Sequence, residues 1–283
     1  QENELKIRIY AMISATQKNL DYYINKGIIK TDRLHVRSFK IYGDGALGSR
    51  GAAMRKSYSD RSNHFGALIY KPERYREMAK QIAASEYQMN THAIGDSANT
   101  WILKAYKTFL QGKTNKRWRI EHAQIIAPED FTLFENVIPS IQPTHATSDM
   151  YWAQDRIGKE RMKGAYAYKD LLEVYGKVAL GTDFPVEQVN PFLTFYAAAV
   201  RKDTDGYPDG GFQIENRLSR EETLKGMTIW AAYSNFEENE KGSIEVGKLA
   251  DFTILDQNIM TIDAAKIPKT KTTATYVNGE KVY

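Results

Sequence analysis

Strand-like and helix-like segments alternate at regular spacing along most of this 283-residue chain. Apolar, β-prone runs predict six strands, and amphipathic runs with capping residues predict helices between them. The predicted strands begin at Lys6, His35, Gln88, Arg117, Ile138 and Lys177. Alternation of this kind predicts a parallel sheet that is covered by helices.

The length of the repeating unit favours one kind of parallel sheet. His92 and His122 stand at the ends of successive predicted strands and are 30 residues apart. A TIM-type (β/α)8 barrel takes about 250 residues, or roughly 31 per unit. We therefore expect an α/β fold of this type. Six strands in place of eight, and a strand almost at the first residue, predict a barrel that is incomplete at its N-terminal side.

The end of the chain has a different pattern. From Gly242 onwards, short β-rich pieces alternate with Gly and Asn-Gly turns. We expect residues 1–241 to form the partial barrel. Residues 242–283 are expected to form a small β-sheet outside it, as part of an accessory β-sandwich.

Composition excludes several classes of protein. The net charge of +4 comes with no dense basic run, so nucleic acid is not an expected partner. No apolar run reaches the roughly 18 residues of a membrane span. The chain has no cysteine, which excludes disulfides and thiolate metal ligands and leaves the cellular compartment open. The oligomeric state is open as well, with a homo-oligomer among the alternatives.

Three residues that can bind metal end predicted strands, namely His92, His122 and Asp183. In a parallel barrel, these strand ends open on one face, where the active site is built. Two imidazoles and a carboxylate form a suitable ligand set for zinc or a similar divalent metal. A single histidine at a strand end is more often structural, so the argument depends on the set of three.

Several longer segments make the comparison specific, because the chain resembles metal-dependent amidohydrolases. The resemblance is to the subgroup that includes N-substituted formamide deformylases. The matching segments run in family order from Phe39 to Asp256 and read FKIYGDGALGSRGAA, THAIGDSAN, RIEHAQ, SIQPTHATSDM, ALGTDFPVE and GSIEVGKLADFTILD.

The resemblance implies roles for four residues. His92 and His122 correspond to metal ligands of the fifth and sixth barrel strands. Asp183 corresponds to an aspartate that touches the metal and takes a proton from the attacking water. Lys40 corresponds to a lysine that some relatives carboxylate and use as a metal ligand. An ordinary, salt-bridged lysine is the alternative at that position.

The loops of the expected barrel mouth supply further candidates. His145 is expected to bond the substrate or its carbonyl oxygen, with a purely structural role as the alternative. Asp44 and Arg50 are expected to face the substrate pocket. They lie in a loop whose glycines match GxGxxG, a pattern that can also indicate a dinucleotide-binding oxidoreductase. That alternative requires a helix to start within the motif, whereas the following residues have the composition of a loop.

One family motif does not occur in the sequence. The family's first strand carries a His-x-His pair that binds metal, and none of the five histidines is spaced in this way. We expect that motif upstream of Gln1. The resemblance implies a hydrolase that cleaves a C–N, amide-like bond in a small molecule by means of metal-activated water. The alternative for this chain is an inactive fragment or binding module that keeps the fold without a complete metal site.

Overall fold

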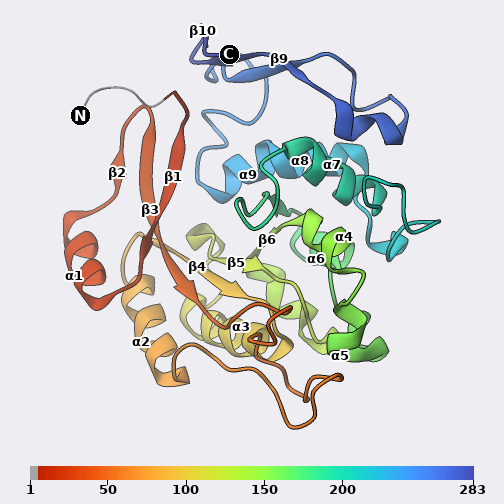
Figure 1. The fold of residues 1–283 in the computed structure, drawn as a ribbon. Helices are drawn as coiled ribbons and strands as arrows, with labels where there is room; N and C mark the ends of the chain where they lie inside the picture. The colour runs from red at the N-terminus through yellow and green to blue at the C-terminus, as the bar shows by residue number, and fades with distance from the viewer. Residues whose placement is uncertain (1–5) are drawn as a thin grey trace. The chain divides into compact units, whose positions relative to one another are not determined.

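The computed structural model describes residues 6–283, which form two units (Figure 1). The first, here called the sheet unit, comprises Ile9–Ile141 and Asp149–Lys177. The second, here called the C-terminal unit, comprises residues 6–8, Gln142–Ser148 and Val178–Tyr283. In the described part of the chain, no helix has the length and apolarity needed to cross a membrane.

The sheet unit is built on parallel strands in the order β1-β3-β4-β5-β6. Figure 1 shows β1, β3 and β4 side by side, with the short strand β2 paired antiparallel to β3. The strands are β1 (Ile9–Ser14), β2 (Ile29–Lys30), β3 (Leu34–Tyr42), β4 (Gln88–Ala93), β5 (Arg119–His122) and β6 (Ile138–Ile141). The predicted parallel sheet is thereby confirmed, whereas closure into a barrel stays a prediction.

Helices connect these strands and supply much of the core. They are α1 (Gln17–Lys26), α2 (Pro72–Ala83), α3 (Asp96–Leu110), α5 (Ala153–Met162) and α6 (Tyr168–Tyr175), with short 3₁₀ helices η1 (Thr114–Lys116) and η2 (Pro128–Asn136). The core of the unit contains fully buried side chains, among them Phe39, Met89, Ile120, Tyr106 and Trp118. The rings of Tyr106 and Trp118 lie edge to face, with 4.7 Å between their centroids. Burial of such side chains is the main stabilising contribution to a unit of this kind.

The long connection between β3 and α2 has no helix in residues 43–71. It is an irregular loop that ends where Pro72 opens α2, a position that suits proline because its missing N–H has no helical partner there. A dinucleotide-binding motif would need a helix that starts among the glycines. The structure therefore removes the basis of the nucleotide-binding alternative.

The C-terminal unit contains helices around a short strand and a separate small sheet. Its helical parts are α4 (Pro143–Asp149, up to Ser148 in this unit), α7 (Pro191–Val200), α8 (Arg220–Met227), α9 (Ile229–Ser234), η3 (Ile214–Asn216) and η4 (Ala264–Lys269). Strand β7 (Ala179–Leu180) precedes Asp183. A buried cluster that includes Phe195 and Ile267 packs α7 against η4.

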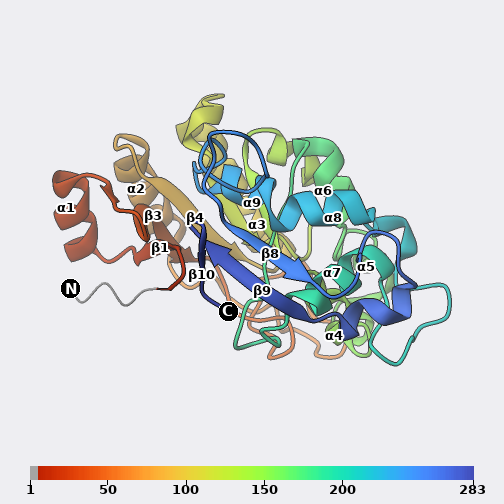
Figure 2. The ribbon, with the colours of Figure 1, turned by 90° about the horizontal axis from the view of Figure 1, so that it is seen from above.

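The small sheet has the antiparallel order β10-β9-β8 (Figure 2). Its strands are β8 (Phe252–Leu255), β9 (Thr272–Val277) and β10 (Glu280–Lys281). Asn278 and Gly279 join β9 to β10 with φ values of 57° and 79°, as expected for an Asn-Gly hairpin turn. The β-rich tail predicted from the sequence is confirmed. The predicted domain boundary at residue 242 stays a prediction.

One strand prediction needs correction. The strand predicted to begin at Ile138 ends at Ile141, and Pro143 opens α4 instead. Proline at a first helical position is pre-organised for the helix, which explains why this segment does not continue as a strand. The cap residue of α3 is Gly95. Ser219 caps α8 and forms a reciprocal capping box with Glu222.

Candidate active site

His92 lies at the carboxyl end of β4, and the Gly-Asp turn that follows it has a steric cause. In register, His92 pairs with Tyr42 of β3 and with Glu121 of β5. A Cβ atom at Gly95 would lie 2.1 Å from the carbonyl oxygen of Ala53, so only glycine fits there. The chain can then turn directly into α3 while the imidazole stays at the strand end.

His122 is the last residue of β5 and has an unusual backbone conformation. Its φ is 75°, and that of Ala123 is 44°, both in the left-handed region that side chains other than glycine's disfavour. The ring of His122 lies edge-on to that of His92, with 4.5 Å between the ring centroids. Such backbone strain is often found at functional sites. The sheet unit thus brings two of the three predicted ligand side chains together.

Asp44 is buried immediately beside this histidine pair. It is 2% exposed, and its carboxylate accepts hydrogen bonds from the backbone amides of Ala53, Ile94 and Gly95 at 2.8, 3.0 and 2.8 Å. Its Oδ1 also lies 3.5 Å from Nε2 of His92. Burial raises the pKa of Asp44 to about 7, although the three amide bonds act in the opposite direction. No observation tests the predicted substrate contact of Asp44.

Arg50 belongs to an ion-pair cluster on the same loop. Its Nε and Nη2 donate to Asp60 at 2.9 and 2.7 Å, and Arg156 of α5 donates to the same carboxylate. Hydrogen bonds from the two arginines lower the pKa of Asp60 to about 2, with Arg50 the larger cause. The cluster holds the loop in place. The substrate contact predicted for Arg50 stays a prediction.

Lys40 lies on β3 near a buried carboxylate. Glu121 is 7% exposed and accepts hydrogen bonds from Arg119 at 2.8 Å and Ser140 at 2.6 Å. Burial alone would raise the pKa of Glu121, but the charges of Arg119 and Lys40, together with the Ser140 bond, lower it. The charge of Lys40 therefore helps to keep Glu121 ionised. Carboxylation of Lys40, which requires the neutral amine, stays a prediction.

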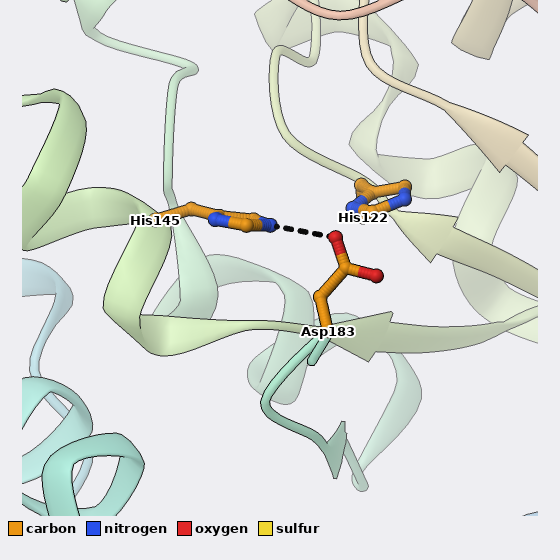
Figure 3. A group of neighbouring side chains, drawn as sticks. All are labelled: His122, His145 and Asp183. Carbon is orange, nitrogen blue, oxygen red and sulfur yellow. Dashed lines mark hydrogen bonds and ion pairs between the residues drawn. The ribbon is translucent and has the colours of Figure 1, made fainter. Parts of the chain in front are cut away.

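Asp183 and His145 form an ion pair in the C-terminal unit (Figure 3). Asp183 follows β7 with a left-handed φ of 58°, and its side chain is 35% exposed. Nε2 of His145, on α4, lies 3.3 Å from Oδ2 of Asp183. Both residues were singled out from the sequence, and the structure brings them together. His145 lies on a helix, however, and not at the end of a strand.

Glu187 is a third member of this group, and the sequence analysis missed its role. Its Oε1 accepts from Nδ1 of His145 at 2.9 Å and from the hydroxyl of Ser148 at 2.6 Å. Burial would raise the pKa of Glu187, but these two hydrogen bonds and the charge of His145 lower it. A usable signal was present, because Glu187 follows Asp183 by four residues within the same loop.

The predicted ligand side chains are of types that suit a divalent metal. His92 and His122 are imidazoles of the sheet unit, and Asp183 is a carboxylate of the C-terminal unit. Figure 3 draws His122, His145 and Asp183, two imidazoles and a carboxylate. Nitrogen and oxygen donors of these kinds are typical zinc ligands, and they also suit other divalent transition metals.

Comparison with known proteins identifies the family. The model of the amidohydrolase family matches residues 1–283. Protein LONG AFTER FAR-RED 3 of Arabidopsis thaliana is 32% identical over 280 residues, which are 97% of this chain and 48% of that protein. N-substituted formamide deformylase of Arthrobacter pascens is 24% identical over 251 residues, 86% of this chain and 44% of the enzyme. The chain thus spans about half the length of these curated relatives.

A solved structure agrees with this assignment. An uncharacterized metal-dependent hydrolase from Pyrococcus horikoshii OT3 matches with a TM-score of 0.81 and 28% sequence identity. The match covers 93% of this chain and 53% of that one. The family resemblance inferred from the sequence is therefore confirmed, and the chain belongs to the amidohydrolase family.

Proposed function

We propose that the protein containing this chain is a metal-dependent hydrolase that cleaves a C–N bond in a small, amide-like substrate. The observation that carries the proposal is the pair of imidazoles at adjacent strand ends, His92 and His122, with their rings 4.5 Å apart in a chain of the amidohydrolase family. The similarity to a metal-dependent hydrolase over 93% of the chain supports it.

In this proposal, His92, His122 and Asp183 hold the metal, which we propose to be zinc, and Lys40 is a further ligand if it is carboxylated. When bound, the metal would supply a Lewis acid for the substrate carbonyl and lower the pKa of a water molecule. The remaining chemistry falls to side chains of the protein.

Asp183 is the proposed general base. Its carboxylate is 35% exposed, so water can reach it, and its contact with His145 restricts its position. It would accept the proton of the attacking water and return it to the departing nitrogen. His145 is proposed to bond the substrate oxygen, and Asp44 and Arg50 are proposed to shape the pocket from the β3–α2 loop.

The proposal is tested on the protein expressed from its complete gene. Substrates are N-substituted formamides, N-acyl amino acids and cyclic imides, assayed before chelation, after chelation and after return of zinc. We expect chelation to abolish hydrolysis of at least one class and zinc to restore it. Asp183→Asn should lower kcat by about 10²–10⁴-fold, the usual range for a general base.

Asp209→Asn is the matched control, because Asp209 is an exposed aspartate of the same unit. It should retain the parent's kcat. Hydrolysis that survives chelation, an Asp183→Asn variant with parental kcat, or a zinc-loaded protein inactive on every class would overturn the proposal.

A further inference from the structure

We infer that Glu187 is a positioning residue that fixes the orientation of the His145 ring, and through it the place of Asp183. The inference rests on the proposed function in one respect, namely that Asp183 acts as the base. It assigns a role to a carboxylate that no part of the proposed mechanism uses.

The geometry shows one imidazole held between two carboxylates. Nδ1 of His145 donates to Glu187 at 2.9 Å, and Nε2 faces Asp183 at 3.3 Å. A hydrogen bond at one ring nitrogen fixes the orientation of the whole imidazole ring. Because Glu187 accepts from Nδ1, the ring is held so that Nε2 points to Asp183.

Ser148 strengthens this arrangement from the same helix as His145. The serine lies three residues after the histidine in α4, which places both side chains on one face of the helix. Its hydroxyl donates to the same Oε1 of Glu187 at 2.6 Å. Two donors from one helix therefore hold a single carboxylate oxygen, which leaves the imidazole little freedom to rotate.

The bonds also close the loop that carries the base. Asp183 and Glu187 are the first and last residues of a short turn, in which the amide of Val186 donates to the carbonyl of Asp183 at 2.8 Å. His145 bonds the side chains at both ends of that turn. These hydrogen bonds hold Asp183 at its left-handed φ of 58°, a backbone conformation that costs free energy for an aspartate without such restraints.

Burial is intermediate, as a positioning contact requires. The His145 side chain is 10% exposed and that of Glu187 is 18% exposed. Reduced contact with water strengthens a charge-assisted hydrogen bond. Because the Glu187 side chain is partly exposed, water can take its place next to His145 and Ser148 in a Glu187→Ala variant. We therefore expect this substitution to leave the fold intact.

The test compares Glu187→Ala with Glu187→Gln in the complete protein. Glutamine keeps an acceptor for Nδ1, whereas alanine removes it. The first readout is the ¹⁵N chemical shift of Nδ1 of His145, which reports its hydrogen bond without any need for activity. We expect Glu187→Gln to keep the parental Nδ1 shift and Glu187→Ala to change it.

The second readout is hydrolysis of the substrate found active with the parent. Loss of a residue that supports a catalytic group typically costs about 10–100-fold, so we expect kcat to fall by that factor in Glu187→Ala, with KM little changed. Glu187→Gln should recover most of kcat. Glu221→Ala is the control, because Glu221 is exposed on α8 of the same unit, and it should match the parent in both readouts.

The hydrolase function and the role of Glu187 are tested by different results. A parent that hydrolyses nothing removes the proposed function, and the ¹⁵N shifts still decide the role of Glu187. A folded Glu187→Ala protein with the parental Nδ1 shift and parental kcat would overturn the inference.

Discussion

Asp44 in the sheet unit and Glu187 in the C-terminal unit both face a histidine of the candidate site, yet they are bound differently. Asp44 is 2% exposed and accepts from three backbone amides. Glu187 accepts from two side chains, those of His145 and Ser148, and is partly exposed. The closest approach to the histidine is 3.5 Å for Asp44 and 2.9 Å for Glu187.

Asp44 binds backbone amides, whereas Glu187 binds side chains. Asp44 ties the β3–α2 loop to the turn after His92, so its removal leaves buried amides without an acceptor. Glu187 holds only an imidazole and a hydroxyl, which water can also satisfy. We therefore expect substitutions at Asp44 to act mainly on stability and those at Glu187 mainly on catalysis.

The largest expected effect is on unfolding of the Asp44→Ala variant. Each buried donor left without a partner costs about 1–3 kcal/mol, so we expect a loss of at least about 3 kcal/mol for the three amides. Glu187→Ala should lose about 1 kcal/mol, as for a typical hydrogen bond. Urea denaturation of both variants measures the difference. Equal losses would remove the distinction between the two carboxylates.

Glycine substitutions offer a second, smaller comparison between the same regions. A Cβ at Gly95 would lie 2.1 Å from the backbone oxygen of Ala53, whereas a Cβ at Gly181, two residues before Asp183, meets no atom within 4 Å. We expect Gly95→Ala to cost about 2 kcal/mol or more because the backbone must shift. Gly181→Ala should stay within about 0.5 kcal/mol. A Gly95→Ala protein with the parental free energy of unfolding would show that the backbone near Ala53 shifts at little cost.

The smallest expected effect is the pH dependence of the stability that Asp60 in the β3–α2 loop contributes. The pKa of Asp60 is about 2, below its ordinary value of 3.8, because Arg50 and Arg156 favour the carboxylate. A carboxyl group whose pKa is lower in the folded protein than in the unfolded chain stabilises the fold at pH values above the unfolded-state pKa. That stabilisation is lost as the pH falls through the folded-state pKa. Asp60→Asn should therefore melt below the parent at pH 6 and together with it near pH 2. A melting difference that persists at pH 2 would exclude this ion-pair origin.

Much of the fold follows from sequence patterns that act locally. The β-prone segments around β3, β4 and β5 predict strands, and Asn278-Gly279 predicts its hairpin turn. The switch from β6 to α4 was missed because Pro143 suits either an extended segment or a first helical turn.

The site was predictable at its strand ends and not at its supporting contacts. His92, His122 and Asp183 each end a recognisable apolar run, so position in the chain is enough to select them. Glu187 is marked only by its place four residues after Asp183, and its contact with His145 spans 42 residues of sequence, so the sequence does not encode the pairing itself. Asp44 was noticed as a polar loop residue, but its burial against three backbone amides depends on how the loop folds.

The central proposal is that His122 and Asp183 are both ligands of the metal. The most direct measurement is the zinc affinity of the complete protein, by competition with a chelator, for the parent, His122→Ala and Asp183→Ala. We expect each substitution to weaken zinc binding by more than about 100-fold, the upper range for residues that merely support ligands. Parental zinc stoichiometry and affinity in either folded variant would contradict the claim.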